Sequence, residues 1–163
     1  MGKKRKKIGL PPGSIVFTGN KKVEQVLIHY LQYDNEHLES KTLDSHEKIT
    51  LHPSSDEKVD WYDIRGLHDT SLIEAIGQKF HIHPLILEDA VNTNQRPKFE
   101  EYEQGVFITI RALSFDKASM KIKAEQVAVF FNKGLLISFQ EDKTDLFASV
   151  RERLTAGKGR IRQ

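Results

Sequence analysis

Apolar and β-branched residues gather in short runs along this chain, which predicts a protein with many strands. Such runs span residues 14–18, 26–33 and 59–64, and a brief one lies at 49–51. Each has the length and composition of a strand rather than of a helix. The stretch 52–58, which contains a proline and two serines, is expected to be a loop.

The second half of the chain carries three longer apolar segments, expected as strands at 105–115, 122–132 and 134–140. The links at 116–120 and 132–134 are short and polar, so consecutive strands should pair as an antiparallel meander. Apolar side chains occupy both alternating sets of positions in the first of these strands. That pattern suits a sheet covered on both faces.

Four segments carry helical patterns. Apolar residues between 72 and 80 recur at a spacing near 3.6, after potential caps at 69–71. A second helix should begin at Pro84, because proline fits the first turn, where its missing N–H would have no partner. A short polar helix is expected at 35–40, and a last helix from 144 to 154.

The resulting order of strands and helices does not alternate strictly, so a purely parallel, doubly wound sheet is not expected. We expect an α/β fold with a mixed, largely antiparallel sheet and helices on both faces, which is an α/β/α sandwich. The 163 residues are 38% hydrophobic and 29% charged, as in a globular domain with one core. No window approaches the roughly 20 apolar residues of a membrane helix.

Charge and cysteine content exclude some kinds of partner and site. The chain has no cysteine, which excludes disulfides and thiolate metal sites. The net charge is +2, but five positive charges lie in residues 3–7, and without them it is +2 − 5 = −3. We expect residues 1–8 to form a solvated, disordered basic tail. Few aromatic residues accompany it, so no specific nucleic-acid partner is expected.

The run HPLILEDAVNTNQRP, from His83 to Pro97, is the most distinctive motif. It places two adjacent carboxylates, Glu88 and Asp89, on the helix that begins at Pro84. The pair Arg96–Pro97 then favours extended backbone that runs toward the next strand. Acidic pairs on helix faces are common, so one interpretation of Glu88 and Asp89 is a solvated helix end.

This run, with other motifs in matching order, resembles the soluble amino-terminal domain of the CorA family of divalent-cation transporters. The supporting motifs are GLPPG at 9–13, VDWYDIRGLHD at 59–69, EQVAVFF at 125–131 and VRERL at 150–154. The resemblance covers nearly the whole chain and implies the α/β/α sandwich. It divides the chain into the basic tail at 1–8, a regulatory domain at 9–156 and the truncated start of a stalk at 157–163.

The resemblance implies a cytosolic metal-sensing domain that gates a pore through Mg²⁺ sites between protomers. Its expected location is the cytoplasmic face of the inner membrane, in a pentamer of identical protomers. The stalk, the two membrane spans and the Gly-Met-Asn signature of the family do not occur in this sequence. We therefore expect a soluble fragment that does not conduct ions by itself, and no enzymatic activity.

Oxygen ligands are the expected metal donors, because Mg²⁺ is a hard ion that keeps several waters and takes one or two carboxylates. Consecutive helical residues point about 100° apart, so Glu88 and Asp89 should face two different surfaces. The resemblance makes Asp89 the leading carboxylate that bridges protomers and Glu88 the ligand of a second ion. The backbone carbonyl of Leu10 assists, and partner acids come from the stalk. Co²⁺ or another divalent cation is a possible alternative ion.

Two rival hypotheses remain. One is a stand-alone soluble interaction module, descended from this domain but without metal sensing. The other is a metallohydrolase that uses His81 and His83 with His68 and Asp69, since alternating histidines can bind Zn²⁺. The metallohydrolase is disfavoured, because Pro84 makes His83 a helix cap.

Glu100, with two nearby glutamates at 101 and 103, is interpreted as part of an exposed acidic rim.

Overall fold

The computed structural model describes residues 9–43, 57–157 and 159–162 of the chain. Its centre is a seven-stranded sheet in the order β2-β1-β3-β7-β6-β5-β4. The pairing of β3 with β7 is parallel and the other five are antiparallel. The strands are β1 (Leu27–Tyr33), β2 (Leu38–Leu43), β3 (Val59–Arg65), β4 (Lys98–Tyr102), β5 (Gly105–Asp116), β6 (Lys121–Asn132) and β7 (Leu135–Gln140).

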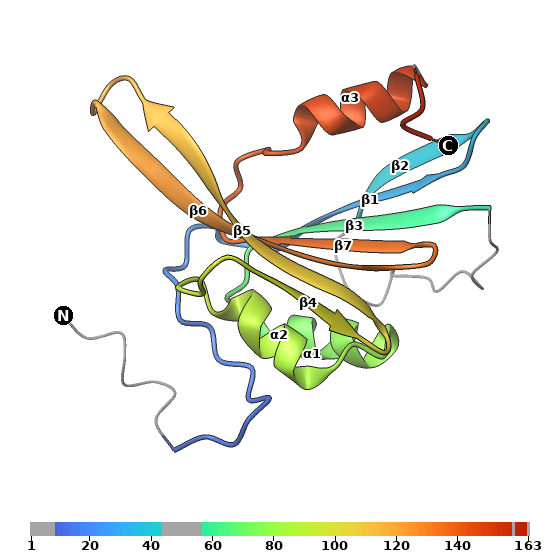
Figure 1. The fold of residues 1–163 in the computed structure, drawn as a ribbon. Helices are drawn as coiled ribbons and strands as arrows, with labels where there is room; N and C mark the ends of the chain where they lie inside the picture. Colours follow the sequence, from blue (N-terminus) through green and yellow to red (C-terminus); the bar gives the residue numbers. More distant parts are fainter. Residues whose placement is uncertain (1–8, 44–56, 158, 163) are drawn as a thin grey trace.

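Helices cover both faces of the sheet. Helices α1 (Thr70–Lys79) and α2 (Pro84–Val91) lie on one face, and α3 (Ala148–Ala156) lies on the other (Figure 1). The larger core cluster joins the first face to α1 and α2 through buried residues such as Tyr62, Ile76 and Ile86. A smaller cluster of Leu31, Trp61 and Leu154 joins the second face to α3. The expected mixed, largely antiparallel α/β/α sandwich is therefore confirmed.

The two helices on the larger core begin at side-chain caps. The carboxylate of Asp69 accepts a hydrogen bond from the Leu72 N–H at 3.0 Å, and the Nδ1 atom of His83 accepts one from the Leu85 N–H at 3.2 Å. Both satisfy N–H groups that have no partner within the helix. Gly77 lets α1 approach α2, since a Cβ atom there would lie 2.1 Å from Leu87 Cδ1.

Two early predictions are wrong. Residues 14–18 form no strand; Thr18 instead donates its N–H to the Val91 carbonyl at 3.4 Å, so this segment lies against the end of α2. Residues 35–40 form no helix, because the carboxylate of Asp34 accepts the N–H groups of Glu36 and His37 at 2.8 and 2.6 Å. This local turn redirects the chain into β2.

Other boundaries also differ from expectation. The exit from α2 becomes a separate edge strand, β4, and the last helix begins at Ala148 rather than near residue 144. That helix ends at Gly157, whose φ is +60°, and the Arg162 guanidinium donates to the Leu154 carbonyl at 2.6 Å. The meander of β5, β6 and β7 is confirmed. The expected tail at 1–8, the strand at 49–51 and part of the loop at 52–58 lie outside the described residues.

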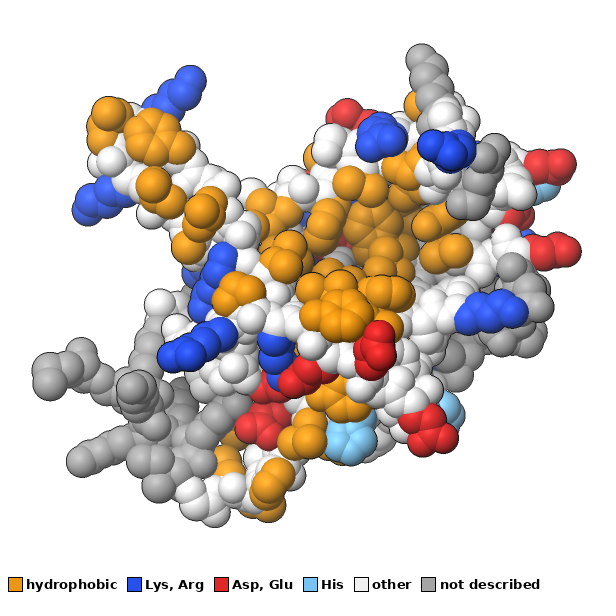
Figure 2. Space-filling view, in the orientation of Figure 1, with side chains coloured by type: hydrophobic (Ala, Val, Ile, Leu, Met, Phe, Trp, Pro, Cys, Tyr) orange, Lys and Arg blue, Asp and Glu red, His pale blue; other side chains and the backbone are white. Residues whose placement is uncertain are grey.

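The sheet is covered unevenly. The strand register places Phe99 and Ile110 on the same face as α3, yet their exposed fractions are 60% and 47%. The β5–β6 hairpin projects beyond the helices, and Figure 2 shows hydrophobic side chains on it and over the middle of this view. The expectation of a sheet covered on both faces is therefore wrong at this end of the described structure. Within the described ranges, every helix is too short or too polar to cross a membrane.

Candidate metal site

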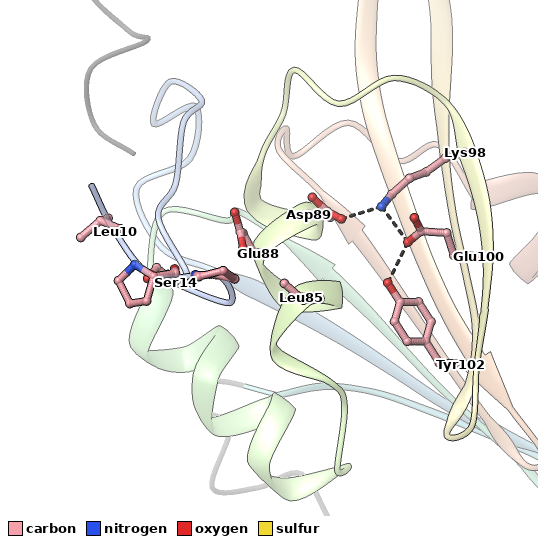
Figure 3. Close-up of a pocket in the computed structure, with 10 residues that line it drawn as sticks. Leu10, Ser14, Leu85, Glu88, Asp89, Lys98, Glu100 and Tyr102 are labelled. Carbon is pink, nitrogen blue, oxygen red and sulfur yellow. Dashed lines mark hydrogen bonds and ion pairs between the residues drawn. The ribbon is translucent and has the colours of Figure 1, made fainter. Parts of the chain in front are cut away.

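A pocket of about 450 Å³ lies between the amino-terminal segment, α2 and β4. All three metal ligands expected from the sequence, Leu10, Glu88 and Asp89, line it (Figure 3). The other lining residues are Pro11, Pro12, Ser14, Leu85, Lys98, Glu100 and Tyr102. The fold thus brings together residues that are up to 92 positions apart in the sequence, counted from Leu10 to Tyr102 (102 − 10).

The two acids of α2 point to different surfaces, as their helical spacing predicts. Glu88 Oε2 accepts a hydrogen bond from the Gly13 N–H at 2.7 Å, on the side of the amino-terminal segment. Asp89 Oδ2 lies 2.6 Å from Lys98 Nζ, on the side of β4. Its other carboxylate oxygen accepts from the Gln95 side-chain amide. A solvated helix end is therefore the wrong interpretation of this pair, because both acids have protein partners.

Gly13 lets the amino-terminal segment lie close against the start of α2. Gly13 has a φ of +84°, and a Cβ atom there would lie 3.0 Å from the Cβ of Pro84. Pro11 and Pro12 lie within a turn that is closed by a 3.3 Å hydrogen bond from the Ser14 N–H to the Pro11 carbonyl. The segment GLPPG therefore places Leu10 and the Gly13 N–H beside Glu88.

Alternate residues of β4 complete the polar side of the pocket. Lys98, Glu100 and Tyr102 share one face of this strand, since side chains alternate along it. Lys98 Nζ lies 2.7 Å from Glu100 Oε2, and the Tyr102 hydroxyl donates to the same oxygen at 2.7 Å. Lys98 thus bridges the carboxylates of α2 and β4, as the dashed lines in Figure 3 show.

These contacts shift the pKa values of the β4 residues. The Lys98 ammonium and the Tyr102 hydroxyl donate to Glu100, which lowers the pKa of that carboxyl. Burial and the hydrogen bond to Glu100 raise the pKa of the Tyr102 hydroxyl to about 12. Burial by itself would lower the pKa of Lys98. The hydrogen bonds of its ammonium to Asp89 and Glu100 have the larger effect, so the pKa of Lys98 is raised. At neutral pH the cluster therefore holds a charged lysine, an ionised Glu100 and a neutral tyrosine.

The donor set suits a hydrated hard cation. Asp89, Glu88 and Glu100 offer carboxylate oxygens, which Mg²⁺ accepts one or two at a time beside its waters. In the parts of the chain that the structure describes, no three His, Cys, Asp or Glu side chains converge on a point where they could hold a metal ion. A divalent ion in this pocket would therefore combine one or two of these carboxylates with water.

Sequence reasoning missed the β4 half of the site. Glu100 was expected on an exposed rim, but it is half-buried and paired with Lys98, whereas the glutamates at 101 and 103 are exposed as expected. The alternation of Lys98, Glu100 and Tyr102 is the signal that could have placed them on one strand face. It gave no indication that this face meets Asp89.

The rival zinc site does not form from the described residues. The Nδ1 atom of His83 caps α2, as expected, and the carboxylate of Asp69 caps α1. His81 lies in the turn between these helices with a φ of +54°. His83 and Asp69 therefore serve as helix caps, and His81 is a turn residue.

Known proteins share the sequence pattern and the fold of this chain. A family model described as CorA-like Mg²⁺ transporter protein matches residues 56–163. Over 158 residues the chain is 39% identical to the cobalt/magnesium transport protein CorA of Thermotoga maritima, and this covers 96% of the chain and 44% of the relative. The chain thus spans less than half the length of that protein.

Two solved structures share the fold. The full-length CmaX protein has a TM-score of 0.66 at 15% identity, over 86% of this chain and 42% of its own. The soluble domain of CorA from Methanocaldococcus jannaschii has a TM-score of 0.56 at 16% identity, over 78% of this chain and 46% of its own. The family model covers more than half of the chain, so the chain belongs to the CorA-like Mg²⁺ transporter family.

Proposed function

We propose that this chain is the metal-sensing regulatory domain of a CorA-type divalent-cation transport protein. The regulatory ion is Mg²⁺, with Co²⁺ as an alternative, and the domain works at the cytoplasmic face of the membrane. Family membership supports the transport role. Its relatives are named as transport proteins, which supports a function other than catalysis.

The observation that carries the sensing role is the convergence of Leu10, Glu88 and Asp89 on one pocket. Both acids are half-buried, so their carboxylates are held by the protein yet remain within reach of a second chain. In the proposed pentamer, Asp89 and an acid of a neighbouring protomer share a hydrated Mg²⁺. The ion offsets the repulsion between the two carboxylates.

Gating then follows from differential binding. An ion shifts an equilibrium between open and closed arrangements only if it binds one of them better. A Mg²⁺ ion between protomers requires both carboxylates to be close, so it favours the arrangement in which the domains are in contact. When the ion leaves, repulsion between the acids favours separation and an open pore.

The first test uses the isolated chain. We expect Mg²⁺ to shift amide NMR resonances of α2 and β4, and paramagnetic Co²⁺ to broaden the same signals. Asp89→Asn should weaken the affinity about tenfold or more, since one ionised ligand is lost. Glu103→Gln, which removes one exposed charge, is the matched control. Unchanged affinity in Asp89→Asn would remove Asp89 from the site.

The second test uses a longer protein that contains the pore. Asp89→Asn should weaken inhibition of ion flux by Mg²⁺ and reduce Mg²⁺-dependent protection from protease. Asp89→Lys should retain closure, because its ammonium can replace the bound cation. If Asp89→Asn keeps wild-type inhibition at every Mg²⁺ concentration, the sensing role is wrong.

The alternative is an interaction module without metal sensing. The exposed side chains of Phe99 and Ile110 on the α3 face favour a protein contact there. This alternative predicts that millimolar Mg²⁺ or Co²⁺ leaves every resonance of the pocket unchanged while the chain remains folded.

A further inference from the structure

The pocket already contains a cation, the ammonium group of Lys98. Its Nζ atom lies 2.6 Å from Asp89 Oδ2 and 2.7 Å from Glu100 Oε2. The exposed fraction of the Lys98 side chain is 25%, and that of Asp89 is 17%. The ammonium is therefore partly buried in the pocket, in contact with the carboxylate proposed to bind the regulatory ion.

We propose that Lys98 is a built-in competitor that sets the concentration at which a divalent cation binds Asp89. This inference rests on the proposed function. A cation that approaches Asp89 must either displace the ammonium or remain next to it. Displacement breaks the ion pair of Lys98 with Asp89, and co-occupancy places two positive centres together. Both raise the concentration of divalent cation that the site requires.

Local charge explains why a divalent ion can still bind. The carboxylates of Glu88, Asp89 and Glu100 carry −3 and Lys98 carries +1, so the pocket has a formal charge of −3 + 1 = −2. A divalent ion matches that charge. A monovalent ion would only replace one positive charge with another, and the tethered ammonium has the advantage of a high effective concentration.

The chemistry of lysine suits exchange. Lysine carries a compact point charge on a flexible four-carbon stem, whereas an arginine fork holds a carboxylate in a fixed, bidentate geometry. Glu100 lies two residues from Lys98 on the same strand face, so the ammonium can leave Asp89 and keep its second partner. The Tyr102 hydroxyl, which donates to Glu100, keeps that second partner in place.

The test compares Lys98→Gln with the wild-type chain in Mg²⁺ titrations followed by NMR at constant ionic strength. We expect Lys98→Gln to bind Mg²⁺ about tenfold more tightly, because an adjacent positive charge is removed. Lys117→Gln, in the exposed turn of the β5–β6 hairpin, is the matched control and should leave the affinity unchanged. Lys98→Arg retains the charge and should bind no more tightly than wild type.

A double variant locates the effect. Lys98→Gln/Asp89→Asn should bind Mg²⁺ no more tightly than Asp89→Asn alone, because the carboxylate that Lys98 would release is absent. If the double variant binds Mg²⁺ more tightly than Asp89→Asn, Lys98 acts through the general electrostatic field of the protein and the inference is wrong. Far-UV circular dichroism with urea titration checks that each variant is folded.

The outcomes separate this inference from the proposed function. If wild type binds Mg²⁺ through Asp89 but Lys98→Gln binds it no more tightly, the competitor role is wrong and the sensing role stands. If Lys98→Gln binds Mg²⁺ through Asp89 and wild type does not, the competitor role is supported at its strongest. If neither chain binds Mg²⁺ or Co²⁺, both proposals fail for this pocket.

Discussion

Two charged clusters on opposite faces of the sheet are built in contrasting ways. On the α3 face, Asp63 of β3 has an exposed fraction of 0%, whereas Asp89 in the metal pocket has 17%. Asp63 accepts hydrogen bonds from five donor atoms, at distances between 2.6 and 3.1 Å. These donors are Arg65 Nε and Nη2, Arg151 Nη1, Ser138 Oγ and Gln140 Nε2.

The difference separates a structural ion cluster from an exchangeable one. The cations around Asp63 are guanidinium groups, which stay charged and hold carboxylates in a fixed geometry. One of them, on Arg151, comes from α3 and reaches a residue 88 positions away in the chain. Asp89 instead faces a flexible lysine at the edge of an open pocket. We therefore expect the Asp63 cluster to stabilise the fold and the Asp89 cluster to respond to ions.

The largest expected effect is the loss of the central acid. Asp63→Ala should lower the free energy of unfolding by about 3 kcal/mol, because Arg65 and Arg151 lose the buried carboxylate that they share and keep only the partly exposed Asp145. Asp89→Ala should lower it by less than about 1 kcal/mol, since Lys98 can turn to water and to Glu100. Urea denaturation measures both values. Equal losses would contradict the distinction between the clusters.

The next effect concerns the attachment of α3. Arg151→Gln should lower stability by about 2 kcal/mol, because it removes a charged hydrogen bond to Asp63 and a cation–π contact over the Trp61 ring. Hydrogen exchange should show earlier opening of α3 than of α2. Arg153→Gln, an exposed position on the same helix, is the control and should change neither quantity.

The Asp63 cluster should also make the stability of the folded chain depend on pH. His29 lies opposite Asp63 on the neighbouring strand, and burial together with the positive charges of Arg65 and Arg151 lowers the pKa of its imidazole below 6.5. As pH falls below 6.5, the unfolded chain takes up a proton at this residue before the folded chain does. The contribution of His29 to the free energy of unfolding is therefore complete above pH 6.5 and decreases as the pH falls below that value.

The measurement compares urea midpoints from neutral pH down to about pH 5.5. His29→Gln should make the dependence on pH shallower, because glutamine does not titrate. His37→Gln, at a largely exposed position, should leave it unchanged. If the urea midpoint of the wild-type chain rises as the pH falls through this range, the predicted direction of the pH dependence is wrong.

The smallest effect is expected from the exchangeable pair. Lys98→Gln should change the free energy of unfolding by less than about 1 kcal/mol, because partly exposed ion pairs contribute little. Added salt should reduce even that difference. A loss comparable with that of Asp63→Ala would show that Lys98 is a structural residue and would weaken its role as a competitor.

Local patterns predicted much of the fold. The start of α2 at Pro84 and the antiparallel meander depend on residues close in sequence, and both were expected correctly. One failure has a local cause and the other a long-range cause. The carboxylate of Asp34 satisfies two N–H groups of a turn, which favoured a hairpin over the expected helix at 35–40. The strand expected at 14–18 had apolar composition but lies against α2 instead of a neighbouring strand.

The sequence by itself determined that Glu88 and Asp89 face different surfaces, because consecutive helical residues point about 100° apart, and the family resemblance made them candidate metal ligands. Only the tertiary structure decided what each acid meets. Strand β4 brings Lys98 to Asp89, and the GLPPG segment brings the Gly13 N–H to Glu88 from 75 positions away. Side-chain periodicity is a property of one element, whereas a counterion depends on which elements pack together. The sequence therefore revealed the acids, and the packing revealed the cation between them.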